Sequence, residues 1–137
     1  MDIIQKVSEI KIIPVVKLDR PEDAEPLAEA LCAGGLPAAE ITFRTAAAEE
    51  SIRTIAKAYP DMIVGAGTVL SAEQARRAVD AGAQFLVTPG FSRSVTEFAV
   101  DKGIPIIPGV CTPTELMYLL EYNLNVAKFF PAGQYGG

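Results

Sequence analysis

The chain has 137 residues, of which 50% are hydrophobic and 21% charged, a composition typical of a globular domain with an apolar core. Its formal charge of −5 argues against nucleic-acid binding, which normally requires a basic surface. Histidine is absent, which excludes Ser-His-Asp and Cys-His catalysis, histidine-ligated zinc and a histidine general base.

The N-terminal residues and the two cysteines both indicate a cytoplasmic protein. Residues 1–6 place no basic region before a long apolar run, so we predict no signal peptide. No apolar window reaches the roughly 18 residues that a membrane span requires. Cys32 and Cys111 lie far apart and match no metal-ligand spacing, so we expect two buried thiols rather than a disulfide.

A strand followed by a helix repeats along the chain. The apolar, β-branched runs that predict strands begin near Lys11, Ala38, Met62, Gln84, Ile104 and Asn125. Helical periodicity fills the gaps, as in the first gap at Ala24, Leu27, Ala28 and Leu31 and in the second at Ile52, Ile55, Ala56 and Tyr59. Successive runs start 20–27 residues apart, which leaves room for one helix per crossover and predicts a parallel sheet.

Capping residues predict where these helices begin and end. Three Ser or Thr residues stand three positions before Glu or Gln, the spacing of a capping box: Ser71, Ser94 and Thr112. Glycines able to take the left-handed conformation follow the expected helix ends, at 34–35, 82 and 103.

An open doubly wound sheet and a (β/α)₈ barrel both fit this pattern. A dinucleotide-binding open sheet is disfavoured because residues 17–21 hold no glycine and residues 65–70 lack the third glycine of its fingerprint. We therefore predict one α/β domain over residues 1–137, a (β/α)₈ TIM barrel of which about six β/α units lie in this chain. Eight units need roughly 180–200 residues, so we expect a shortened barrel, or else strand edges that another chain covers.

Charged residues share one face of the second predicted strand. Side chains alternate along a strand, so Glu40, Thr42 and Arg44 face the barrel interior while Ile41 and Phe43 face the helix layer.

The sixth predicted strand adds a third charge to the same interior. By the same alternation Lys128 and Phe130 point inward and Phe129 points toward the helices. Charges inside a barrel are costly unless they are paired or used. A structural Glu40–Lys128 ion pair would satisfy this condition. Three charges close to strand ends favour an active site, which barrels carry at the carboxyl ends of their strands.

A lysine in an apolar strand has a well-known use in forming a Schiff base with a carbonyl compound. Glu40 could then move protons among the intermediates. Arg44 could bind a carboxylate with two hydrogen bonds, and Thr68, at the end of the third strand, could donate another. These residues form a coherent acid–base set for a 2-keto acid substrate.

Five motifs resemble those of the bacterial 2-keto-3-deoxy-6-phosphogluconate (KDPG) aldolases, many of which also cleave 4-hydroxy-2-oxoglutarate (KHG). They are EITFRT at 40–45, GAGTV at 65–69, TPG at 88–90, IPGV with TPTEL at 107–116, and KFFPA at 128–132. The matches run along the whole chain in the same order as in the family. The resemblance implies a class I aldolase on a (β/α)₈ barrel, usually a homotrimer, that takes part in the Entner–Doudoroff pathway. It also implies that the reaction needs no metal and no cofactor.

The resemblance also implies a role for each matched residue. Lys128 corresponds to the Schiff-base lysine and Glu40 to the general acid and base, while Arg44 and Thr68 correspond to residues that hold the pyruvyl carboxylate. Pro89 and Phe130 correspond to residues that line the pocket around the keto acid. Lys17 corresponds to a basic residue near the anionic end of the substrate. The family binds its substrate phosphate with strands seven and eight, whose motifs this sequence does not contain.

Three functional hypotheses follow. The first is a pyruvate-forming aldolase that cleaves KDPG to pyruvate and glyceraldehyde 3-phosphate, or KHG to pyruvate and glyoxylate. The second is a catalytically inactive barrel fragment that acts only as an oligomerising module. The third, a sugar-phosphate epimerase or isomerase, is disfavoured because such enzymes typically use a metal or a histidine base, and the chain has no histidine. Only the first requires a small-molecule partner of the 2-keto acid class.

Overall fold

The computed structural model describes residues 2–137, and its first element is a helix that the strand–helix repeat did not predict. Helix α1 (Ile3–Ile10) begins at Asp2, whose side chain accepts hydrogen bonds from the backbone N–H groups of Ile4 (2.6 Å) and Gln5 (3.2 Å). This is a typical N-cap, which satisfies amide groups that have no partner within the helix.

One α-helix follows each of the first five predicted strands, and a 3₁₀ turn follows the sixth. The strands are β1 (Val15–Val16), β2 (Ala38–Thr42), β3 (Ile63–Gly67), β4 (Leu86–Val87), β5 (Ile106–Ile107), β6 (Gly109–Val110) and β7 (Lys128–Phe129). The helices after α1 are α2 (Ala24–Ala33), α3 (Ala48–Ala58), α4 (Ala72–Ala81), α5 (Arg93–Lys102) and α6 (Pro113–Glu121), with 3₁₀ turns η1 (Pro21–Asp23) and η2 (Gly133–Tyr135). The predicted alternation is confirmed.

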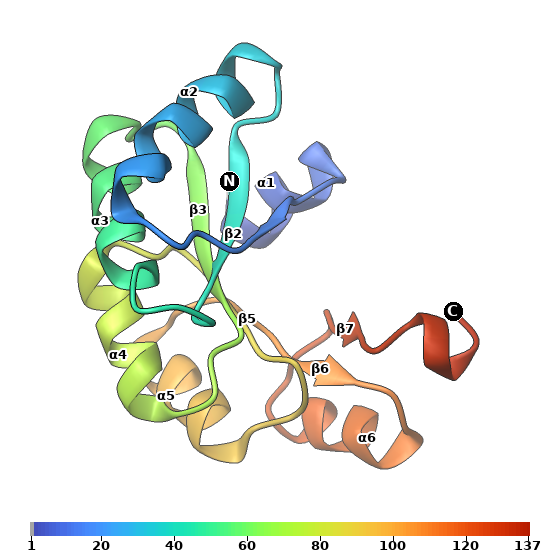
Figure 1. Ribbon diagram of the computed structural model, residues 1–137. Coiled ribbons are helices and arrows are strands. Elements are labelled where there is room, and N and C mark those ends of the chain that lie inside the picture. Colours follow the sequence, from blue (N-terminus) through green and yellow to red (C-terminus); the bar gives the residue numbers. More distant parts are fainter. Residues whose placement is uncertain (1) are drawn as a thin grey trace.

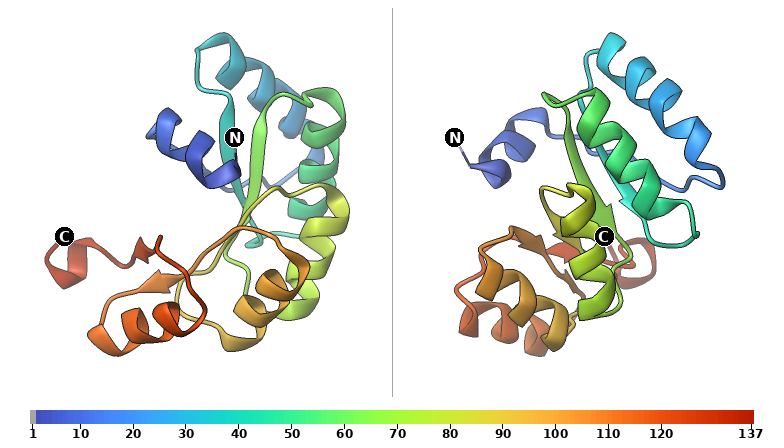
Figure 2. Two further views of the ribbon diagram at one scale, coloured as in Figure 1. Left: turned by 180° about the vertical axis from the view of Figure 1, so that it is seen from behind. Right: turned by 90° about the vertical axis from the view of Figure 1, so that its left-hand side faces the viewer.

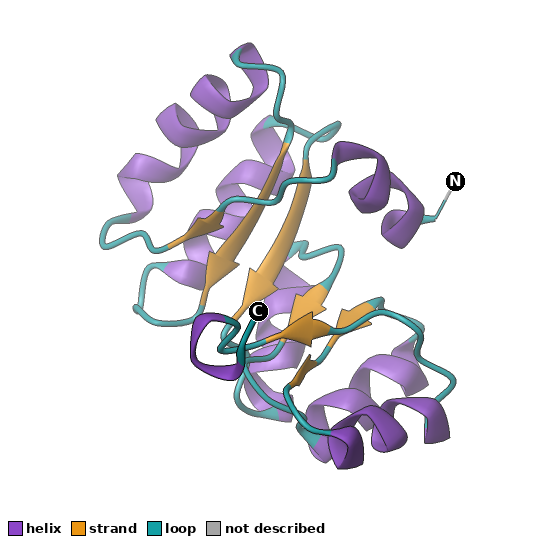
Figure 3. Ribbon diagram, turned by 90° about the vertical axis from the view of Figure 1, so that its right-hand side faces the viewer, coloured by secondary structure: helices purple, strands orange, loops and turns teal. Residues whose placement is uncertain are grey.

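The strands form a parallel sheet in the order β1-β2-β3-β4-β5, and β6 pairs with β7 in a separate ladder. Figure 3 shows the arrowheads of neighbouring strands pointing the same way. The fifth predicted strand is divided between β5 and β6 at Pro108, which has no N–H to donate to a ladder. Sequential parallel order with one helix per crossover is the pattern of a (β/α)₈ barrel, of which the described residues form an arc.

Two apolar clusters lie on opposite faces of the strands. The outer cluster packs the sheet against the helices and includes Ile41, Val64 and Leu86. The inner cluster consists of Ala38, Ile63, Phe85 and Val87, and it is covered by apolar side chains that include Ile3, Val7 and Ile10 of α1. Figures 1 and 2 show α2, α3, α4 and α5 along one side of the sheet and α1 on the other. Because Ala38 and Ile63 begin their strands, α1 closes the amino-terminal end of the arc.

The helix boundaries confirm most of the predicted caps. Thr112 and Glu115 form the complete capping box, and Gly82 and Gly103 end α4 and α5 in the left-handed conformation. The side chain of Ser71 caps α4 as predicted. Its partner Gln74 instead accepts a hydrogen bond from the Leu70 N–H at 2.8 Å.

The prediction of a cap at Ser94 is wrong. The cap of α5 is Ser92, which accepts a hydrogen bond from the Val95 N–H at 3.3 Å. Ser94 was predicted because Glu97 stands three residues later, the spacing of a capping box. Ser92 is followed at that position by Val95 and caps the helix through its own side chain alone.

Two predictions about burial need correction. Phe129 is 46% exposed rather than packed beneath helices, because β7 is the last strand of its ladder and pairs only with β6 among residues 2–137. Cys32 and Cys111 are free thiols as expected, but both are half-buried rather than buried.

Within residues 2–137, no helix combines the length and the apolar character that a membrane span requires.

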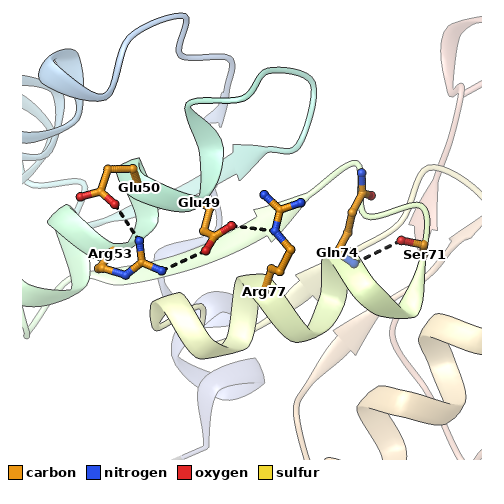
Figure 4. Close-up of polar contacts among 6 residues, drawn as sticks. All are labelled: Glu49, Glu50, Arg53, Ser71, Gln74 and Arg77. Atoms are coloured by element: carbon orange, nitrogen blue, oxygen red, sulfur yellow. Dashed lines mark hydrogen bonds and ion pairs between the residues drawn. The ribbon is translucent and has the colours of Figure 1, made fainter.

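An ion-pair network joins α3 to α4 on the outer surface. Glu49 accepts hydrogen bonds from Arg53 (3.0 Å) in its own helix and from Arg77 (2.7 Å) in the next, and Arg53 also pairs with Glu50 (2.7 Å) (Figure 4). The hydrogen bonds from Arg77 and Arg53 lower the pKa of the Glu49 carboxyl below its ordinary value. This network ties the two neighbouring helices together.

Candidate active site

The strand register brings together residues of different strands in the interior of the arc. Glu40 of β2 is paired in register with Gly65 of β3, and Gly109 of β6 is paired with Lys128 of β7. Side chains from both ladders converge, so that Lys128 Nζ lies 3.9 Å from Glu40 Oε1. The two residues predicted from alternation to face the same interior therefore meet across it.

Lys128 is placed between a carboxylate and an aromatic ring. Its amine lies 4.8 Å from the centroid of the Phe130 ring, within the range of a cation–π contact. The Lys128 side chain is 26% exposed and the Glu40 side chain 7% exposed. The amine is thus held in a partly apolar site and remains open to a small molecule.

Burial sets the protonation of Glu40. Desolvation raises the pKa of its carboxyl above the ordinary value, because the charged form is poorly solvated inside the arc. The positive charges of Lys128 and Arg44 act in the opposite direction and are the weaker effect. The net shift favours the protonated carboxyl, which is the form that a general acid requires.

Arg44 lies just beyond the end of β2 and is anchored by Thr42. The Arg44 Nε–H donates to Thr42 Oγ1 at 3.1 Å, and the buried Thr42 hydroxyl donates in turn to the carbonyl oxygen of Val16 at 2.9 Å. This chain of hydrogen bonds fixes one edge of the guanidinium and leaves its other N–H groups exposed for an anion.

Thr68 follows the end of β3 in an unusual backbone conformation. Its φ of 51° lies in the left-handed region, which a β-branched residue rarely adopts. Residues held in such conformations cluster at ligand-binding sites, where the fold imposes the strain. The half-buried Thr68 directly follows Gly67, whose α-carbon contacts the Glu40 side chain, so it stands next to the acid–base pair.

The strain at Thr68 predicts a reversal of the usual stability order. We expect the Thr68→Gly variant to be more stable than Thr68→Ala by about 0.5–1 kcal/mol, because alanine retains the left-handed penalty and glycine does not. Urea unfolding of both variants measures this difference. At Arg76, which is exposed in α4, the same two substitutions should give the ordinary order with alanine more stable. Equal stabilities at position 68 would contradict the strain argument.

The remaining predicted site residues differ in how directly they join this group. Pro89 follows β4, and its carbonyl lies so close to Gly109 that a β-carbon there would overlap it, which places Pro89 beside the register partner of Lys128. Lys17 follows β1, is 50% exposed on its side chain and pairs with Asp19 at 3.2 Å. The structure therefore brings Glu40 and Lys128 together, with Phe130, Arg44, Thr68 and Pro89 around them, and leaves Lys17 at the rim.

Two glycines of this group were not predicted. Gly67 and Gly109 line the site through the space that they leave, since a β-carbon on either would overlap Glu40 or Pro89. Gly67 lies in the GAGTV motif and Gly109 in the IPGV motif, but neither motif by itself shows that the glycine makes room for a neighbouring group. Among residues 2–137, no cluster of three or more potential metal-ligating side chains is present.

The comparisons with known proteins agree with this geometry. The sequence profile described as "Aldolase: KDPG and KHG aldolase" matches residues 3–137. The chain belongs to the KDPG and KHG aldolase family. Within this family it is 48% identical over 135 residues to the 2-dehydro-3-deoxy-phosphogluconate aldolase of Treponema pallidum, an alignment that covers 98% of this chain and 64% of that protein.

Two further members of the family extend the comparison. The KHG/KDPG aldolase of Escherichia coli K12 is 45% identical over 126 residues, which cover 92% of this chain and 59% of that enzyme. A crystal structure of the KDPG aldolase of Legionella pneumophila, with pyruvate captured as a covalent carbinolamine intermediate, superposes with a TM-score of 0.88. It is 43% identical, and the match covers 91% of this chain and 61% of that one. The chain thus spans about three fifths of the length of these relatives and has the fold of part of their barrel.

Proposed function

We propose that the protein is a class I aldolase that forms a Schiff base between Lys128 and a small 2-keto acid. The observation that carries this proposal is the placement of the Lys128 amine 3.9 Å from a buried carboxyl in the interior of the arc. The relatives carry aldolase names, and none of the comparisons supports the catalytically inactive alternative.

The first stage of the proposed reaction is imine formation. The neutral Lys128 amine adds to the C2 carbonyl of the substrate to give a carbinolamine, which loses water to become an iminium ion. Glu40 donates the proton that the departing hydroxyl requires and is left as a carboxylate. Its raised pKa suits this step because the shift favours the protonated carboxyl.

The second stage breaks the C3–C4 bond. The Glu40 carboxylate accepts the proton of the C4 hydroxyl, the bond electrons flow to the iminium nitrogen, and an aldehyde and an enamine result. Protonation of the enamine at C3 by Glu40 and hydrolysis of the iminium then release pyruvate and the free Lys128. Since the step at C3 is reversible, pyruvate alone should exchange its methyl protons with solvent.

The remaining residues would position the substrate. Arg44 would bind its carboxylate through the N–H groups that Thr42 does not use, and Thr68 would add a hydrogen bond. Pro89 and the ring of Phe130 would form apolar walls that limit access of water to the iminium. Lys17, at the rim, would attract the anionic end of a longer substrate.

Several finer properties belong to the same proposal. By analogy with the relatives, KDPG and KHG are the candidate substrates, and the products would be pyruvate with glyceraldehyde 3-phosphate or glyoxylate. A homotrimeric assembly and a place in the Entner–Doudoroff pathway are further parts of the proposal that follow from the resemblance. A cytoplasmic location is another part, supported by the free thiols of Cys32 and Cys111.

Reductive trapping tests the proposed function directly. Incubating the protein with pyruvate and borohydride should add one pyruvyl group, detected by intact mass and assigned to Lys128 by peptide mapping. Without pyruvate, borohydride should leave the mass unchanged. An adduct on another lysine, or no adduct, would contradict the assignment of Lys128 as the nucleophile.

A further inference from the structure

Strand β3 carries two glycines on its inner face, one layer apart. Gly65 and Gly67 are paired in register with Glu40 and Thr42 of β2. Neither glycine has a positive φ, so their backbone is open to any residue and conformational freedom does not explain them. Space is the remaining reason for a glycine in a strand.

The space at each glycine is filled by a different side chain. A β-carbon on Gly65 would overlap the ring of Phe85, which is completely buried. A β-carbon on Gly67 would overlap the Glu40 carboxyl group and lie 2.6 Å from its Cγ. The Glu40 side chain therefore lies across the α-carbon of Gly67, and its path toward Lys128 depends on the missing methyl group.

We propose that Gly67 is a positioning residue, whose lack of a side chain sets the place of the Glu40 carboxyl relative to the Lys128 amine. The inference rests on the proposed function for its catalytic consequence. Gly67 itself touches no reacting atom and acts through Glu40. Gly65 performs the corresponding task for Phe85 one layer lower, where the interior is apolar.

The two glycines differ in what a methyl group would displace. At Gly67 the overlapping atoms form the far end of a flexible side chain, which can rotate away while the backbone stays in place. At Gly65 the overlap is with the Phe85 ring, which is enclosed in the inner core. An added methyl group would therefore overpack that core. Gly67→Ala should therefore mainly move the carboxyl, and Gly65→Ala should mainly weaken the fold.

The exchange of pyruvate methyl protons in D₂O, followed by ¹H NMR, measures the consequence for catalysis. Gly67→Ala should lower the exchange rate about 10- to 100-fold, the effect of displacing a catalytic group by roughly 1 Å, with little change in Tm. In a Glu40→Gln background the same substitution should cause no further loss, because its effect passes through Glu40. Gly65→Ala, the matched control, should lower Tm and show no such dependence on Glu40.

A second readout is independent of the reaction. In the protein without substrate, the carboxyl of Glu40 can be titrated by ¹³C NMR in wild type and in Gly67→Ala. Displacement from the buried position should lower its pKa toward the ordinary value. An unchanged titration, or losses of Gly67→Ala and Glu40→Gln that simply multiply, would overturn the inference. If wild type traps no pyruvate, the aldolase proposal fails while the titration still decides the role of Gly67.

Discussion

Replacing Lys128 with methionine is expected to abolish covalent trapping of pyruvate and to reduce the exchange of its methyl protons by about a thousandfold or more, because the Lys128 amine itself supplies the imine nitrogen. Methionine keeps most of the length and the apolar stem of the side chain and loses only the amine, with its cation–π contact to Phe130. Exchange measured by ¹H NMR and trapping measured by intact mass report the two effects separately.

Two controls separate the nucleophile from the charge. Lys128→Arg restores a cation beside Glu40, but a guanidinium is protonated at neutral pH and cannot attack the carbonyl, so it should be as inactive as the methionine variant. Lys57→Met, in the last turn of α3 and exposed, should trap and exchange like wild type. Activity retained in Lys128→Arg would mean that the residue acts through its charge, and the Schiff-base proposal would then fail.

The repeating fold was predictable because its signals are local. Each crossover required a strand and a helix of ordinary length, and the periodicities of 2 and 3.6 residues are visible along the chain. Helix α1 was missed because the predicted repeat begins with a strand and α1 precedes that strand. Its signals are nevertheless present, since Asp2 is its cap and Ile3, Val7 and Ile10 form its apolar stripe. Phe129 was misassigned because alternation gives the face of a residue but not what covers that face.

The candidate site was predictable only in part. Alternation placed Glu40 and Lys128 in one interior, and the 3.9 Å contact confirms that they meet. The anchoring of Arg44 by Thr42 and the left-handed conformation of Thr68 depend on loop geometry that no periodicity encodes. Gly67 was noted only within the GAGTV motif and within a nucleotide-binding fingerprint that lacks its third glycine. A glycine that is required for space leaves no distinguishing pattern in a single sequence.

Glu40→Gln is expected to reduce pyruvate exchange by about 10²–10⁴-fold, the usual contribution of a positioned acid–base group. Glutamine preserves the shape of the side chain across Gly67 and cannot carry the proton. In wild type the exchange begins with the protonated carboxyl, which imine formation turns into the base at C3, so the exchange rate should fall as pH rises through the raised pKa of Glu40. This limb of the pH profile should be absent in the variant. A variant that exchanges at the wild-type rate would remove Glu40 from the mechanism.

Glu40→Gln should also make the protein more stable than wild type as the pH rises, although it lowers activity. The folded-state pKa of Glu40 lies above its ordinary value of 4.5, so the folded protein binds this proton more tightly than the unfolded chain does. Its contribution to stability is complete below that ordinary value and is lost as pH rises through the folded-state pKa. The unfolding free energy of wild type should therefore fall relative to that of Glu40→Gln over this window. Urea unfolding across the acid-to-neutral range measures the divergence, and parallel curves would contradict a raised pKa. The fold thus gives up stability at neutral pH to keep a proton-carrying group beside Lys128.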